Sequence, residues 1–164
     1  MVVEVIVMKI KKNDILLFAE LRKNARESLT RLSKKTRIPV STIYDKLKYH
    51  TGSLIKKHCA LLDFSQLGFP TKTTMLLKSN PEKRKELLEF LKKNRFVNTL
   101  LRINNDYDFF VEAIFRNMKE SEDFVARLEE EFGVINKKVC YVVDEIKKEE
   151  FLSDPLSVEL LTKQ

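Results

Sequence analysis

The second half of the chain has an order of sequence patterns that few folds accommodate. Four segments rich in β-branched, aromatic and other apolar residues predict strands over residues 71–79, 96–103, 107–115 and 137–146. Helical patterns lie between them over residues 80–94 and 117–133. Asn80 followed by Pro81 predicts the start of the first helix. Asn117, with Glu120 three residues later, predicts the start of the second, and Gly133 predicts its end. The order, strand-helix-strand-strand-helix-strand, is the ferredoxin-like split βαβ motif.

The first part of the chain instead has the spacing of three short helices, predicted over residues 13–28, 28–36 and 40–50. Asn13 or Asp14 is expected to cap the first helix and Ser28 the second. Pro39 cannot lie inside a helix and so separates the second from the third, which Gly52 suits as a left-handed end. Two short helices joined at such a break form a helix-turn-helix, here preceded by a supporting helix. The expected fold class is therefore α+β, with an N-terminal helix-turn-helix (winged-helix-like) domain and a C-terminal ferredoxin-like βαββαβ domain.

The charge of the chain is unevenly distributed. Residues 1–62 hold 14 Lys or Arg and 5 Asp or Glu, a net charge of +9, whereas residues 63–164 hold 17 and 19, a net charge of −2. An asymmetry of this kind suggests a polyanion-binding part joined to a part with another task. A helix pair with a solvated basic face, a different DNA-binding fold and an RNA-binding surface are the alternatives.

In a helix-turn-helix the last helix lies in the major groove of double-stranded DNA, and the helix before it crosses the phosphate backbone. The residues of the last helix predicted to face inward are Val40, Ile43 and Leu47. The predicted DNA-binding residues are Lys34, Lys35, Arg37, Ser41, Thr42, Asp45, Lys46, Lys48 and Tyr49. Ser41 and Thr42 stand at the helix start, where base edges are usually reached, while Tyr44 is expected nearer the edge of the core. Lys46 and Lys48 flank the outward face of the helix. Lys34, Lys35 and Arg37 lie on the preceding helix and turn, where phosphates are expected to pass, so affinity should fall steeply with salt.

The stretch from Arg26 to Phe69, which contains this pattern, resembles the N-terminal domain of the leucine-responsive/AsnC (feast/famine) transcription regulators. Residues 52–63 are similar to the strand that connects the two domains of that family, and the βαββαβ half resembles its effector-binding and oligomerisation domain. The resemblance covers residues 9–150. It implies a DNA-binding domain at 9–58, a connecting strand and hinge at 59–70, an effector-binding and oligomerisation domain at 71–150, and a C-terminal tail at 151–164.

The resemblance also implies two kinds of partner besides DNA. The sequence "NNDYDFF" falls where the family has a glycine-containing turn, so a pocket for a small-molecule effector such as an amino acid is expected beside Asn104, Asn105, Asp106 and Asp108. A plain hairpin turn with solvated acids is the alternative. The strand at 107–115 has apolar residues on both faces, so one face is expected to cover helices and the other to meet a second copy of the chain. The chain is therefore expected to form a homodimer or a higher oligomer.

Four positions depart from the family pattern. Arg37 stands at the corner between the two helices, where Gly is usual, and must adopt the turn at some strain. Pro39 occupies the usual place of a Ser cap. Asp45 stands where a basic residue is frequent; its carboxylate repels phosphate but can accept a hydrogen bond from cytosine. Asn105 replaces a Gly, and Asn tolerates the left-handed conformation.

We expect a regulator rather than an enzyme, with no cofactor and no metal. The chain has three glycines, none of them in a phosphate-binding loop, and both histidines lie in its basic half. His58 and Cys59 are adjacent, so on a strand they would face opposite sides and could not share a metal ion. A haem-biosynthesis decarboxylase on the same two-domain layout and an assembly module that does not bind DNA remain the alternatives.

The compartment expected from the sequence is the cytoplasm, with no membrane partner. No apolar run approaches the roughly 20 residues of a membrane-spanning helix. The two cysteines are far apart and are typical of reduced thiols. Residues 1–7 are interpreted as an upstream extension or an added strand before a natural start at Met8. The tail after Phe151 is expected to be loose or to form a short helix.

Overall fold

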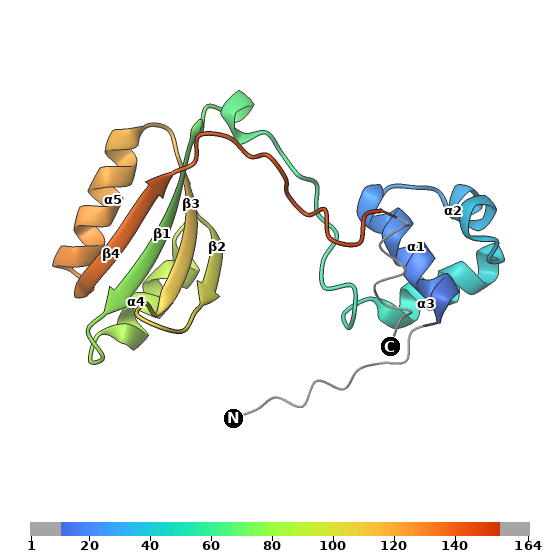
Figure 1. The fold of residues 1–164 in the computed structure, drawn as a ribbon, viewed down its shortest axis with the longest axis horizontal. Helices are drawn as coiled ribbons and strands as arrows, with labels where there is room; N and C mark the ends of the chain where they lie inside the picture. Colours follow the sequence, from blue (N-terminus) through green and yellow to red (C-terminus); the bar gives the residue numbers. More distant parts are fainter. Residues whose placement is uncertain (1–10, 155–164) are drawn as a thin grey trace. The chain divides into compact units, whose positions relative to one another are not determined.

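The computed structural model describes residues 11–154. The described part of the chain divides into a helical unit, residues 11–60 with 146–154, and a sheet unit, residues 61–145 (Figure 1). The expectations for residues 1–7 and for the end of the tail lie outside the described residues. Residues 146–154 belong to the helical unit, which they contact at Glu149. The Arg22 guanidinium donates to the main-chain carbonyl of Glu149 at 2.8 Å and to its carboxylate at 3.0 Å.

The helical unit contains α1 (Lys12–Lys23), α2 (Leu29–Thr36) and α3 (Val40–His50). The buried residues of its core are Leu17, Leu32, Ile38 and Ile43, with the partly buried Leu21, Leu29 and Leu47 packed against them. The second and third helices match their predictions, whereas α1 ends earlier than predicted. Asn24 follows it in an extended conformation, and its side-chain oxygen accepts a hydrogen bond from the Arg26 N–H at 3.0 Å. This local bond competes with continuation of the helix.

The turn between α2 and α3 has the backbone that the sequence predicts. Ser28 caps α2 by accepting a hydrogen bond from the Arg31 N–H at 3.3 Å. Arg37 ends α2 in the left-handed region, with φ 57° and ψ 29°, so the strained corner is confirmed. Pro39 takes the N-cap position of α3 and makes no side-chain cap bond. Gly52, one residue beyond the C-cap, has φ 84° as expected.

The start of α1 differs from its prediction. Lys11 takes the N-cap position, and Asn13 and Asp14 lie inside the first turn. Asp14 is only 7% exposed, and its carboxylate lies 2.6 Å from the Lys46 ammonium of α3. An ion pair between two helices has therefore engaged the carboxylate that was expected to cap the helix.

The predicted connecting strand is wrong. Residues 56–63 are exposed and have no regular secondary structure, and a short 3-10 helix, η1 (Phe64–Leu67), follows them. A strand requires a neighbour whose N–H and C=O groups complete the hydrogen-bond ladder. Among residues 11–154 no segment pairs with 56–63, so the apolar and β-branched content of this stretch does not produce a strand in a single chain.

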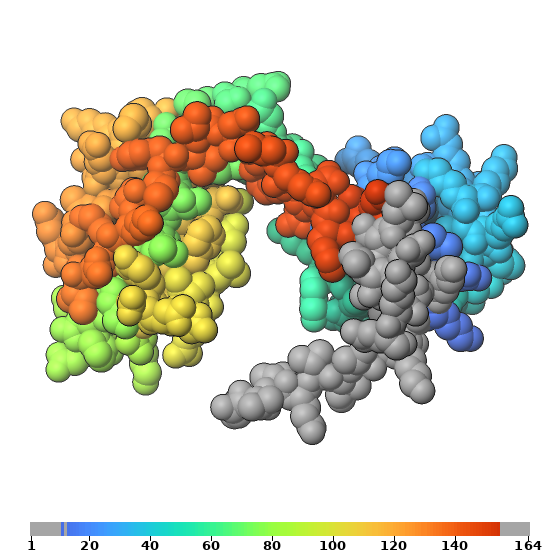
Figure 2. All heavy atoms as spheres, in the orientation of Figure 1, coloured from blue at the N-terminus to red at the C-terminus, as the bar shows by residue number. Residues whose placement is uncertain are grey.

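The sheet unit confirms the ferredoxin-like fold class. Its elements are β1 (Thr71–Ser79), α4 (Arg84–Lys93), β2 (Val97–Arg102), β3 (Phe109–Phe115), α5 (Met118–Glu130) and β4 (Val134–Tyr141). The strands form one antiparallel sheet in the order β2-β3-β1-β4 (Figure 1). The two edge strands, β2 in yellow and β4 in orange-red, lie on opposite sides of this unit in Figure 2.

Both helices of the sheet unit cover the same face of the sheet. The core contains alternate strand residues, Met75 and Leu77 on β1 and Val111 and Phe115 on β3. It also contains Leu87 and Leu91 of α4 with Phe124 and Leu128 of α5. The side chains between those strand residues lie on the other, open face. Register places Leu101, Phe110 and Leu76 side by side across β2, β3 and β1 on that face.

Three ends of elements in this unit are informative. α4 begins at Arg84 rather than at Pro81, because residues 81–83 form a turn in which Asn80 accepts a hydrogen bond from the Glu82 N–H at 3.2 Å. The cap of α5 is confirmed, since Asn117 accepts from the N–H of the residue three positions on at 2.9 Å. β4 ends at Tyr141 because its partner β1 begins at Thr71 and offers few further ladder groups.

Candidate nucleic-acid interface and effector region

The outward side of α3 is identified from the residues of this helix that are buried in the core. Ile43 is fully buried and His50 is 6% exposed, so the opposite side of the helix faces outward. The exposed side chains on that side are Ser41, Tyr44, Asp45, Lys48 and Tyr49. The first four have the i, i+3, i+4, i+7 spacing of one helix face. We call these five residues the α3 face.

Three side-chain placements on α3 differ from the sequence reading. Val40 is 42% exposed rather than inward, because it stands at the first turn, beyond the reach of the small core. Tyr44 is 57% exposed rather than at the core edge. Thr42, predicted at a base edge, is half-buried. A helical wheel whose buried side is centred on Ile43 and His50, instead of on Val40, places Tyr44 on the exposed side.

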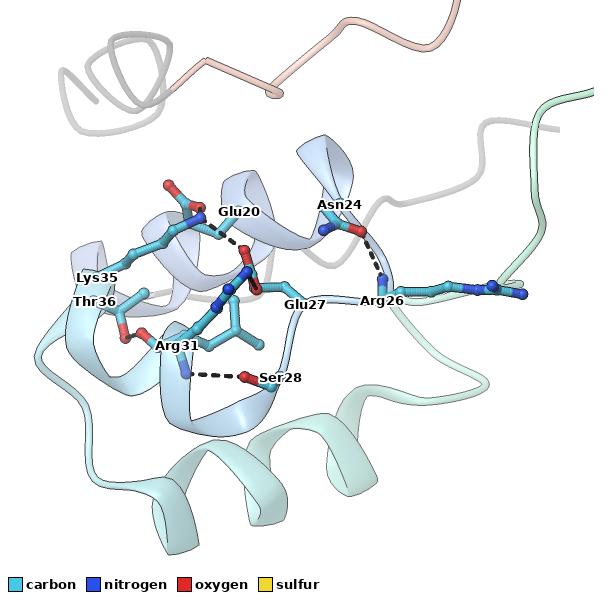
Figure 3. Close-up of polar contacts among 9 residues, drawn as sticks. Glu20, Asn24, Arg26, Glu27, Ser28, Arg31, Lys35 and Thr36 are labelled. Carbon is cyan, nitrogen blue, oxygen red and sulfur yellow. Dashed lines mark hydrogen bonds and ion pairs between the residues drawn. The ribbon is translucent and has the colours of Figure 1, made fainter.

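Lys35 is held by two carboxylates of its own unit. Its ammonium lies 2.6 Å from Glu20 of α1 and 3.0 Å from Glu27 of the α1–α2 loop, as Figure 3 shows. Hydrogen bonds to Glu20 and Glu27 raise the pKa of Lys35. The hydrogen bond from Lys35 likewise lowers the pKa of Glu27, which also pairs with Arg31 at 3.6 Å. This cluster ties α2 to α1 and to the loop, so the charge of Lys35 is already compensated.

Lys46 is the second predicted DNA-binding cation with an internal partner. Its pair with Asp14 joins α3 to α1, and the two side chains are 26% and 10% exposed. By contrast, Lys34, Arg37 and Lys48 are exposed and have no charged partner within residues 11–154. The structure thus separates cations that hold the helices together from cations that face outward.

The turn between β2 and β3 contains the expected effector-binding residues. Asn104, Asn105 and Asp106 are exposed, and Asn105 has the left-handed φ of 67° predicted for the position of a Gly. Asp108 is different: its carboxylate accepts hydrogen bonds from the N–H and hydroxyl of Ser79 at 2.9 and 3.0 Å. The turn therefore survives without Gly, and only Asp108 of the four is fixed by the fold.

Two cations complete the surroundings of Asp108. Arg84 lies 3.0 Å and Lys78 4.0 Å from its carboxylate. Burial alone would raise the pKa of Asp108, but the Ser79 hydrogen bonds and the two positive charges outweigh it, so the pKa is lowered. The side chain ties β3 to the end of β1 and the start of α4, and its oxygens are engaged there.

A hollow of about 410 Å³ lies between α4 and the edge strand β2. Its lining residues are Leu88, Leu91, Lys92, Val97, Asn98, Leu100, Arg102 and Phe109. Arg102 and Phe109 are the residues at either end of the β2–β3 turn. The lining is mainly apolar, with the cations at its border, a composition that suits a small ligand with an apolar part. Lys92 pairs with Glu89 at 2.8 Å, whereas Arg102 is exposed and has no charged partner among residues 11–154.

Other kinds of site have little support in the described part of the chain. Within residues 11–154 no three His, Cys, Asp or Glu side chains are grouped so that they could hold a metal ion. Cys59 and Cys140 are free and exposed. Among the helices of residues 11–154, none is long and apolar enough to span a membrane.

Comparison with known proteins finds HTH-type transcriptional regulators among the sequences similar to this chain. No family model matches the chain. An HTH-type transcriptional regulator of Pyrococcus horikoshii, itself uncharacterized, is 28% identical over 136 residues, covering 82% of this chain and 91% of the relative. A similar regulator of Pyrococcus furiosus is 26% identical over 149 residues, covering 90% of this chain and all of the relative.

Solved structures of transcription regulators have the same fold as this chain. A transcriptional regulator of Neisseria meningitidis, crystallised as a complex with L-methionine, has a TM-score of 0.77 at 20% identity and covers 85% of this chain and 93% of its own. LrpC of Bacillus subtilis has a TM-score of 0.77 at 16% identity, covering 85% and 99%. The resemblance stated from the sequence is confirmed. The chain is similar in sequence to HTH-type transcriptional regulators of Pyrococcus and has the fold of the AsnC and Lrp regulators.

Proposed function

We propose that the protein is a cytoplasmic, sequence-specific DNA-binding transcription regulator, and not an enzyme, that acts as a dimer or larger oligomer under the control of a small molecule. The observation that carries this proposal is the α3 face, an outward row of polar, aromatic and basic side chains on the last helix of a helix-turn-helix. The basic charge of the first 62 residues and the regulator relatives support it.

The structure supports three different roles for the predicted DNA-binding residues: phosphate contact, base contact and packing of the helices. Lys34, Arg37 and Lys48 are the cations free to contact phosphates, which provide affinity without sequence information. Ser41 and Asp45 on the α3 face are placed to contact base edges; a carboxylate can accept from the amino group of cytosine. Lys35 and Lys46 act by holding the helices. Tyr49 belongs to the α3 face, and the half-buried Thr42 flanks that face.

A homodimer is proposed through the open face of the sheet. The row formed by Leu101, Phe110 and Leu76 crosses three strands, and Leu101 is 52% exposed in the single chain. A second copy covering this row would remove apolar surface from water at both partners. Two-fold symmetry would then present two α3 faces to half-sites one DNA turn apart, or a multiple of it.

The effector is proposed to be an amino acid or a related small molecule at the turn between β2 and β3. The hollow between α4 and β2 reaches both ends of that turn, and Arg102 offers a charge for a carboxylate. A ligand there would change DNA binding only if its affinity differs between two assembly states. Thermal shift with a panel of amino acids that includes L-methionine tests this step; failure of all of them to stabilise the protein would contradict it.

DNA binding is tested by fluorescence anisotropy with a fragment from upstream of the protein's own gene and a scrambled fragment of equal length. Tighter binding to the upstream fragment, with affinity that falls steeply with salt, is expected. Equal affinity for both fragments would contradict sequence-specific regulation, and the absence of binding at low salt would contradict the DNA-binding function itself.

A further inference from the structure

Two lysines in the segment after α3 are not used by the arrangement described above. Lys56 and Lys57 open the exposed stretch 56–63. Neither has a hydrogen bond or an ion pair with any residue of the range 11–154. In this they differ from Lys35 and Lys46, whose charges are compensated by carboxylates.

The turn that leads from α3 to these lysines is held by main-chain hydrogen bonds. Gly52 adopts φ 84°, and its N–H donates to the carbonyl of Ile55 at 3.0 Å. The N–H of Ile55 donates in turn to the carbonyl of His50 at 2.9 Å. Ile55 therefore lies beside the last turn of α3, and Lys56 and Lys57 follow it directly. The start of the segment is fixed to the helix even though the rest of it has no regular structure.

The length of α3 indicates what lies near its C-terminal end on DNA. Its 11 residues span about 16 Å at 1.5 Å per residue. The major groove is about 12 Å wide, so a helix of this length that enters the groove end-on, with its first turn at base edges, extends beyond the groove at its other end. The groups that border the groove are phosphates. The basic side chains that follow the helix end are thus the next to meet the DNA backbone.

We propose that Lys56 and Lys57, held by the turn at residues 51–55, form a second DNA-contacting element that binds phosphates flanking the site contacted by α3. The inference rests on the proposed function and adds a contact surface to it. Each lysine at a phosphate releases a condensed counterion, which makes binding stronger at low salt and independent of base sequence.

The test uses the full chain and the variant Lys56→Gln/Lys57→Gln, with anisotropy titrations between 50 and 200 mM salt. The matched control is Lys85→Gln/Lys93→Gln, which removes the same charge from two exposed positions of α4 in the sheet unit. The double variant at 56 and 57 should lower the magnitude of the salt slope by up to about 1.8, at about 0.9 per phosphate contact. The ratio of affinities for the upstream and scrambled fragments should stay unchanged, and the control should keep the wild-type slope.

Four results would overturn the inference. A slope equal to that of the wild type would show that the lysines do not contact phosphates, while leaving the proposed function intact if the wild type still prefers the upstream fragment. An equal fall in slope in the control would show a non-local effect of net charge. A changed preference between fragments, with an unchanged slope, would assign the lysines to base contacts instead. Failure of the wild type to bind DNA would refute the proposed function and this inference together.

Discussion

The ion pair between Asp14 and Lys46 predicts that Lys46 stabilises the helical unit and does not contact a DNA phosphate. Replacing Lys46 with Met keeps an unbranched side chain that is one atom shorter and removes its charge, which leaves the Asp14 carboxylate at 10% side-chain exposure without a partner. Removing one partner of a fully buried pair costs about 3–5 kcal/mol. Lys46 is 26% exposed, so water can replace part of the lost interaction, and we expect a loss of about 2 kcal/mol.

For a chain of this size that loss corresponds to a fall in Tm of about 4–8 °C, measured by circular dichroism or calorimetry. The double variant Asp14→Leu/Lys46→Met removes both charges and should recover most of the stability, because no isolated charge remains buried. At temperatures where both proteins are folded, the salt slope of DNA binding by Lys46→Met should equal that of the wild type. An unchanged Tm together with a slope reduced by about 0.9 would refute the reasoning and assign Lys46 to a phosphate contact instead.

Three further predictions follow from single side chains. Arg37→Gly should raise stability by about 1 kcal/mol in thermal unfolding, because Gly adopts the left-handed corner without strain, yet weaken DNA binding by loss of a cation; a lower Tm would contradict the strain. Lys34→Gln should reduce the salt slope by about 0.9 whereas Lys35→Gln should not, since only Lys35 has internal carboxylate partners; the same slope for both variants would contradict this division. The ionised form of Asp108 should contribute stability that is fully present above the ordinary Asp pKa of about 3.9 and lost as pH falls through its lowered pKa. Asp108→Asn should therefore be less stable at pH 7 and lack that acid-side loss in unfolding measured against pH.

Local sequence signals predicted much of the backbone because they act within a few residues. Ser28 caps α2, Arg37 takes the left-handed corner, and Asn105 replaces Gly in its turn, as the sequence indicates. Two predictions of secondary structure were wrong, the end of α1 and the strand at residues 56–63, and each error has a local physical cause. The helix α1 is shorter than predicted because the side-chain oxygen of Asn24 accepts a hydrogen bond from the Arg26 N–H. The stretch 56–63 is not a strand because no other described segment of the chain pairs with it.

The candidate DNA-binding site likewise has features that the sequence determines and features that depend on tertiary packing. The sequence alone determined that a basic helix-turn-helix precedes a βαββαβ unit, and that the last helix presents Ser41 and Lys48, because helical period and charge are properties of a single segment. Only the tertiary structure decided which cations are free. Whether Lys35 and Lys46 face DNA or a carboxylate depends on the packing of α1 against α2 and α3, which brings Glu20 and Asp14 to them from residues distant in the chain. An ion pair is formed by three-dimensional proximity, and no pattern of spacing within one helix contains it.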